Sequence, residues 1–314
     1  MKTYLLACTL TVAASSQLAF AAVLPTRSVN LSVTGSGSQL TQDPVGTITL
    51  TSSATTPTTQ RFASAAASAD FGILKATTES SASGASVIST GDVLGAQFTD
   101  GLTFSNAALT GTVGFVAFQI LYHWEPTISV SSSASVGNPA YEMLRASAAI
   151  SLSDYAHSGL NNSVSVSQNI TTSCRGTNCS TINNGVGLAK SGNTTILESV
   201  PNQSFTARVS FVFGQEWELG GILLSTTSSG TGSGGNVSGS MDASHSLYWA
   251  GISSVTDSAG NPVEFGLSSA SGSNYLNSFV SSVPELPSGV LLSLGLAIMG
   301  ASARRKLCYR TSLA

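Results

Sequence analysis

Charge is scarce in this chain, because Asp, Glu, Lys and Arg together account for 9% of its 314 residues. Between residues 22 and 282, seven Lys or Arg stand against fourteen Asp or Glu, which gives a formal charge of −7. Such a surface lacks the basic patch that attracts nucleic acid or anionic lipid. The sequence therefore predicts no nucleic acid partner, and it is compatible with divalent cations or neutral glycans.

Motifs that carry chemistry are also scarce. His123, His157 and His245 are scattered without the paired spacing of a metal site. The sequence contains no Gly-x-Ser-x-Gly elbow, and the glycines of residues 230–235 lack the strand-helix unit of a nucleotide site. Residues 257–261 lack the alternating oxygen ligands of a calcium loop and are expected to form a β-turn. We therefore expect no metal, no cofactor and no catalytic residue.

Two carboxylates offer an alternative to this non-enzymatic interpretation. Glu216 and Glu218 flank Trp217; in a strand, both would lie on one face about 7 Å apart. That separation falls within the range of glycosidase carboxylate pairs. The same pattern describes a solvated face with Trp217 packed inward. His123 and Glu125 flank Trp124 in the same way, and we expect them to be surface or structural groups.

Aromatic residues make up only 7% of the chain. Flat rings with polar edges can stack on sugars when several face one groove. The possible glycan contacts are Trp124, Trp217, Tyr248 and Trp249. The alternative is that most of these rings fill the core. Because Tyr248 and Trp249 are adjacent, one of the two should point outward if they lie in a strand.

Cysteine is nearly absent. Outside the two ends the chain has only Cys174 and Cys179. In an oxidising compartment, two cysteines this close can form a disulfide that closes a small loop. A metal site would need further ligands at suitable spacing, and the sequence offers none.

No long amphipathic helix stands out between residues 22 and 282, whereas two-residue apolar periods recur. They occur at residues 147–152, 163–170, 206–213 and 247–255, and residues 113–124 are almost continuously apolar. Residues 61–75 fit a helix or a strand, and the Ser, Thr and Gly of residues 225–240 predict a flexible loop. The predicted fold is all-β, a single antiparallel β-sandwich or jelly-roll-like ectodomain.

The two ends of the chain carry export signals. Residues 1–21 have an apolar core and end in Ala19-Phe20-Ala21, which predicts a cleavable signal helix cut before Ala22. Near the other end, Val283, Pro284, Glu285, Leu286 and Pro287 precede an uncharged run at residues 289–303. Arg304, Arg305 and Lys306 follow as a basic stop-transfer cluster. This pattern predicts a C-terminal transmembrane helix, with residues 307–314 as a cytoplasmic extension.

This three-part tail, residues 283–306, resembles the PEP-CTERM sorting signal of exopolysaccharide-producing bacteria, with Leu286 where that family has proline. The resemblance implies processing by a membrane-embedded exosortase after signal peptidase has removed the leader. Residues 98–104, 248–257 and 269–275 are similar to segments of uncharacterised β-rich exported proteins that carry this signal.

We therefore expect residues 22–282 to form a single exported domain that is anchored in the inner membrane as an intermediate. Its final location would be the cell envelope or the extracellular space. The expected role is non-enzymatic, in association with exopolysaccharide or biofilm. The alternatives are a carbohydrate-binding module and a glycan-active enzyme.

Overall fold

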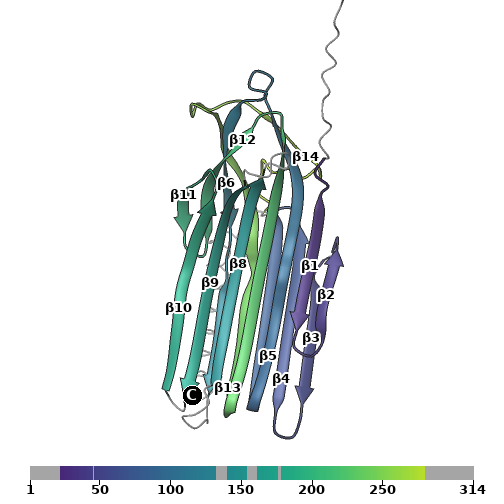
Figure 1. The fold of residues 1–314 in the computed structure, drawn as a ribbon, viewed down its shortest axis with the longest axis vertical. Coiled ribbons are helices and arrows are strands. Elements are labelled where there is room, and N and C mark those ends of the chain that lie inside the picture. Colours follow the sequence, from purple (N-terminus) through teal and green to yellow (C-terminus); the bar gives the residue numbers. More distant parts are fainter. Residues whose placement is uncertain (1–21, 45, 132–139, 154–160, 176–177, 280–314) are drawn as a thin grey trace, which may run out of the picture.

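The computed structural model describes residues 22–279, apart from residues 45, 132–139, 154–160 and 176–177. The described residues form a 14-stranded antiparallel sheet and contain no helix (Figure 1). The predicted all-β class is therefore confirmed. The signal helix, the sorting motif, the transmembrane helix and the basic cluster lie outside the described residues.

The first seven strands are β1 (Thr26–Val33), β2 (Gly37–Gln42), β3 (Ile48–Thr55), β4 (Gln60–Asp70), β5 (Ile73–Ser105), β6 (Val113–Leu121) and β7 (Glu125–Ser131). The other seven are β8 (Ala140–Ser153), β9 (Asn161–Arg175), β10 (Asn178–Ser191), β11 (Thr194–Val200), β12 (Ser204–Val212), β13 (Glu216–Asp257) and β14 (Gly266–Ser269). Residues 61–75, which fitted either element, comprise all of β4 after Gln60, a turn and the start of β5.

Alternating apolar residues place the core where the sequence predicts it. In β12, the side chains of Ala207, Val209 and Phe211 are buried, while Thr206 and Arg208 are only partly buried. A strand turns successive side chains to opposite faces, so one face of β12 packs inward. The buried residues of β4, β6, β8, β9 and β13 join this face in one core.

One continuous sheet takes the place of the two separate sheets of the predicted sandwich. Its main path runs β10-β9-β8-β13-β5-β1-β2. β5 and β13 pair along most of their length, and they are long enough to carry other strands along their outer edges. β13 pairs first with β8, then with β7 and finally with β6, while β5 pairs first with β4 and then with β1.

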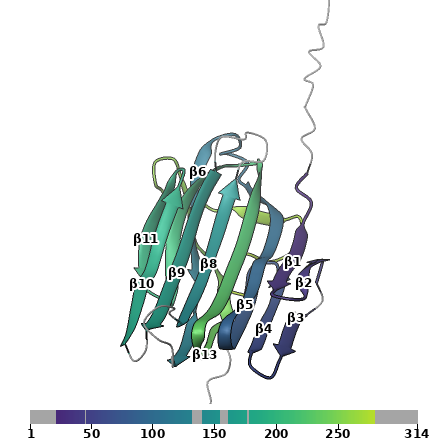
Figure 2. The same ribbon diagram turned by 60° about the horizontal axis from the view of Figure 1, so that its bottom comes forward.

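The long ribbon of β5 and β13 folds back on itself. Ser80 has Gly239 as its register partner, and Ser229 has Ser89. The hydroxyls of Ser80 and Ser229 nevertheless lie 2.8 Å apart. They can meet only if the two halves of the ribbon stack face to face, and Figure 2 shows β5 and β13 side by side at the end where they turn.

Two glycines stand at this bend. Gly84 in β5 has φ 101° and Gly235 in β13 has φ 134°. These values lie in a region that residues with a Cβ rarely adopt. The pairing register also shifts between Ser233 and Asn236, as expected where an irregularity bends a strand.

The predicted flexible loop at residues 225–240 is wrong, because this segment lies within β13. Ser225, Thr227 and Ser229 are at most 1% exposed. Their small side chains face the opposite half of the ribbon, where Ser225 hydrogen-bonds Thr78 at 2.9 Å. Composition predicted a linker, but small residues also suit two sheet layers that approach closely.

The sheet almost closes at a seam between β9 and β12. Asn162, at the start of β9, is fully buried. Its Nδ2 donates to the carbonyl of Ser210 in β12 at 3.0 Å, and its Oδ1 accepts from the backbone N–H of Asn193 at 2.8 Å. One amide side chain therefore ties β12 and the β10–β11 turn to β9.

Residues 270–279, which we call the C-terminal strap, follow β14 and lie across the domain. Asp100 is fully buried and accepts from the backbone N–H of Ser271 at 2.9 Å and from its hydroxyl. Trp249 Nε1 donates to the carbonyl of Tyr275 at 2.7 Å, and the N–H of Phe279 donates to the carbonyl of Trp249 at 3.0 Å. These bonds hold the strap against β5 and β13.

Asp100→Ala is expected to release the strap and to lower the free energy of unfolding by about 2 kcal/mol, because it leaves the Ser271 N–H and hydroxyl without their acceptor. Limited proteolysis with mass spectrometry should then detect new cleavages in residues 270–279. Asp257→Ala is the control, since that exposed carboxylate accepts only within its own turn. Equal protection of the strap in both variants would show that Asp100 does not hold it.

Within the residues that the structure describes, nothing forms a helix of the length and apolarity needed to cross a membrane.

Candidate functional site

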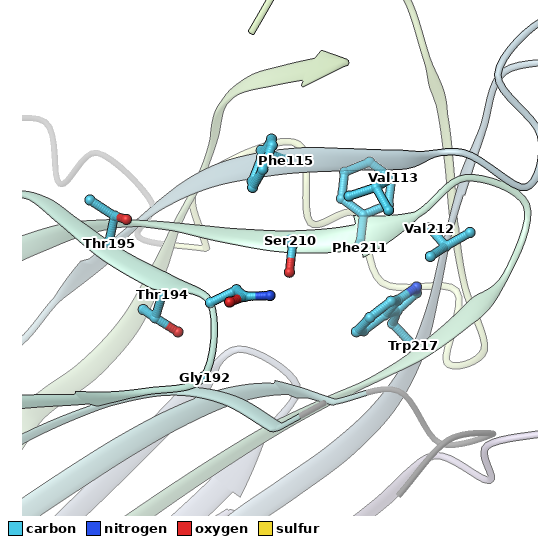
Figure 3. Close-up of a pocket in the computed structure, with 10 residues that line it drawn as sticks. Val113, Phe115, Gly192, Thr194, Thr195, Ser210, Phe211, Val212 and Trp217 are labelled. Atoms are coloured by element: carbon cyan, nitrogen blue, oxygen red, sulfur yellow. The ribbon is translucent and has the colours of Figure 1, made fainter. Parts of the chain in front are cut away.

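A cleft of about 550 Å³ opens beside the seam (Figure 3). Figure 3 shows Ser210 and Trp217 at the space between β12 and the β10–β11 turn. We call it the seam cleft. Its lining residues are Val113, Phe115, Gly192, Asn193, Thr194, Thr195, Ser210, Phe211, Val212 and Trp217.

The chemistry of the seam cleft is neutral and mixed. Its ten lining residues include three aromatic rings, two valines, and the hydroxyl or amide side chains of Asn193, Thr194, Thr195 and Ser210, but no ionisable side chain. The guanidinium of Arg208 lies 5.2 Å from the centre of the Phe115 ring at the edge of this region. That distance allows a cation–π contact, so this cation already has a partner.

Strand geometry gives the cleft fixed walls. Phe115 and Ser210 are register partners across β6 and β12, and Thr194 pairs with Val209 across β11 and β12. The hydroxyl of Thr194 donates to the carbonyl of Ser191 at 2.6 Å, which secures the β10–β11 turn. Together with the Asn162 bridge, these contacts hold the walls without a bound ligand.

A second cleft, of about 420 Å³, lies where β1, β4 and β5 meet. Arg27, Asp70 and Lys75 are among its lining residues. Arg27 and Asp70 already form an ion pair at 2.9 Å. Because these two charges neutralise each other, neither is free to bind a ligand in this cleft.

The predicted glycan contacts do not form one exposed strip. Trp124 and Trp249 are 1% and 2% exposed and belong to the core, so the prediction is wrong for them. Tyr248 is half-buried, with the Lys75 ammonium 5.8 Å from its ring centre, as expected for the outward member of an adjacent pair. Trp217 is equally buried, at 1% exposed, and belongs to the same core, although it also borders the seam cleft.

Glu216 and Glu218 lie on the face of β13 opposite to the buried Trp217. Oε2 of Glu216 accepts from the backbone N–H of Val23 at 3.0 Å, which fastens the start of the described chain. Neither carboxylate lines the seam cleft. The solvated-face interpretation therefore describes this pair better than the glycosidase geometry does.

Nε2 of His123 lies 3.0 Å from Oε1 of Glu125 at the surface, and the two form an ion pair when the imidazole is protonated. The hydrogen bond to Glu125 raises the pKa of His123, and a second bond to the carbonyl of Asn202 acts in the same direction. Among the described residues, no group of three or more His, Cys, Asp or Glu could hold a metal ion. His157 and the side chain of His245 lie outside what the structure describes.

Cys174 and Cys179 form the predicted disulfide, with their sulfurs 2.00 Å apart. They are direct register partners at the hairpin between β9 and β10. The bond therefore joins the edge strand β10, whose side chains are largely exposed, to its only partner strand among the described residues.

Sequence reasoning missed the buried carboxyl of Glu142. This residue is fully buried between the two halves of the ribbon, and it accepts hydrogen bonds from Ser80 and Ser229. Burial raises its pKa to about 7, while the two hydroxyls act in the opposite direction. The signal was present, because Glu142 has the same strand parity as the buried Leu144 and Ala146.

Gly239 leaves the space that Glu142 occupies. A Cβ at this glycine would lie 2.4 Å from Oε1 of Glu142. The cluster of Glu142, Ser80 and Ser229 therefore fills its site and leaves no room for a ligand. The seam cleft is the better candidate for binding.

Comparison of the chain with protein-family models, with curated proteins and with solved structures finds no match.

Proposed function

We propose that this chain is a non-enzymatic exported protein of the cell envelope or extracellular matrix, sorted by an exosortase and associated with exopolysaccharide or biofilm. The observation that carries the proposal is the order of motif, uncharged run and basic cluster in residues 283–306. The disulfide between Cys174 and Cys179 fits an oxidising compartment outside the cytoplasm. Signal peptidase and the exosortase would be its processing partners, with an inner-membrane intermediate between the two steps.

Processing of the tail tests the proposal directly. In cells that contain the exosortase, mass spectrometry of the mature protein should find a C-terminus that lacks residues 289–306. In cells without the enzyme, those residues should remain and the chain should fractionate with the inner membrane. Glu285→Ala should behave like loss of the enzyme, whereas Glu264→Ala, an exposed acid of the domain, should be processed normally. Retention of residues 289–306 in both strains would overturn the proposal.

A carbohydrate-binding module is the second candidate function. It is favoured by the seam cleft, where aromatic rings and neutral hydroxyl and amide groups line one space. Sites for neutral ligands commonly combine apolar walls with a few polar groups that fix orientation. The glycan-active enzyme is the less favoured alternative, since Glu216 is engaged with Val23.

A further inference from the structure

We propose that the seam cleft binds an uncharged saccharide unit, an inference that rests on the proposed association with exopolysaccharide. The cleft volume of about 550 Å³ lies within the range of roughly 300–1,000 Å³ found for small-molecule sites. Its walls come from β6, β11, β12, β13 and the β10–β11 turn. The site is therefore a product of the sheet closing on itself.

The lining excludes a charged ligand. None of its ten residues carries a charge, and the nearby guanidinium of Arg208 stacks on Phe115. A carboxylate or phosphate in the cleft would lose hydration without gaining a counter-charge, which is costly. An uncharged ligand avoids this cost.

The arrangement of apolar and polar groups matches the two kinds of surface on a sugar ring. Phe115 is the partly exposed ring of the lining and offers aromatic surface to a C–H face, whereas Phe211 and Trp217 are 1% exposed core residues that border the cleft. The side chains of Asn193 and Thr195 are exposed at the rim and can exchange hydrogen bonds with hydroxyl groups.

The walls are also set before binding. Asn162 joins β9 to Ser210 and Asn193, two residues that line the cleft. A preorganised site loses little ordering entropy when the ligand enters. The saccharide therefore needs no rearrangement of the sheet.

Isothermal titration of the processed protein tests the assignment. The probes are cellobiose, maltose and lactose as uncharged disaccharides, with digalacturonic acid as a charged one. We expect heat of binding from at least one uncharged disaccharide and none from the acid. Thr195→Phe, at an exposed lining position, should weaken that binding at least about tenfold, which corresponds to about 1.4 kcal/mol.

Ser199→Phe is the matched control, because Ser199 is exposed on the same strand but does not line the cleft. It should leave the affinity within about twofold. If Thr195→Phe lowers the melting temperature, Asn193→Phe at the rim replaces it. Absence of binding by every uncharged probe, preferred binding of the acid, or equal weakening by the two phenylalanines would overturn the assignment. Normal removal of residues 289–306 in the same preparation would show that the proposed sorting stands even if the saccharide site fails.

Discussion

Gly91→Ala is expected to lower the free energy of unfolding by about 3 kcal/mol, a large share of the roughly 5–15 kcal/mol that is typical of a folded domain. Gly91 is buried in the second half of β5, directly against the opposite half of the folded ribbon. A Cβ at this position would lie 2.4 Å from the carbonyl oxygen of Ser64 and 2.8 Å from that of Glu79. Both atoms belong to paired backbone, so neither can move without separating the layers.

The matched control for this substitution is Gly187→Ala in the edge strand β10. A Cβ there would meet nothing within 4 Å, so we expect a change within about 0.5 kcal/mol. Urea denaturation followed by far-ultraviolet circular dichroism measures both variants. Similar midpoints for the two would show that the layers are not held at the close distance that Gly91 permits.

The buried Glu142 is expected to make the domain less stable as pH rises from about 4.5 to about 7. Burial raises the pKa of Glu142 from 4.5 to about 7 in the folded protein. In this interval the folded chain retains a proton that the unfolded chain has released, so stability falls with increasing pH. The total loss is about 3 kcal/mol, because each pKa unit corresponds to about 1.36 kcal/mol.

No charged residue contributes to this shift, since the groups that act on Glu142 are the hydroxyls of Ser229 and Ser80. Glu142→Gln keeps the shape and removes the titration, so this part of the pH dependence should be absent from the variant. Thermal unfolding at pH 5 and pH 8 measures the difference, with Glu198→Gln in an exposed position as the control. If Glu142→Gln showed the same loss between these pH values as the parent protein, the buried carboxyl would not be its source.

The alternation of small and apolar residues identified parts of four of the fourteen strands, β8, β9, β12 and β13. Residues 147–152, 163–170, 206–213 and 247–255 all lie in strands, apart from Phe213 just after β12. The disulfide was also predictable, because Cys174 and Cys179 are the only cysteines between the two ends of the chain. Local patterns suffice for these features because each depends on neighbouring residues alone.

Residues 225–240 show where local composition fails. Ser, Thr and Gly in a row are typical of a linker, yet here they form the part of β13 that folds against β5. Their partners on the other layer, such as Thr78, are about 147 residues away in the chain. Local sequence does not show that such distant segments stack. It therefore did not show that the small residues of this segment allow two layers of the sheet to approach closely.

The sequence also identified some residues of the candidate site and missed others. Trp217 was a candidate from the sequence, whereas Asn193 and Ser210 gave no local signal and become neighbours only when the seam closes. Trp124, Trp217 and Trp249 looked equivalent in sequence, and the folded sheet buries all three in the core, but Trp217 alone of the three also borders the seam cleft. Which aromatic ring meets a cleft depends on how the strands curve.

The sequence by itself determined the all-β class, the positions of several strands and the disulfide, and its terminal segments are the basis of the proposed export route. These properties arise from periodicity, from spacing and from hydrophobic runs, which are local. The tertiary structure decided that β5 and β13 fold into facing layers, that Glu142 is buried between them and that a neutral cleft forms at the seam. These depend on contacts between distant segments, which form only when the ribbon bends at Gly84 and Gly235 and the sheet comes round on itself.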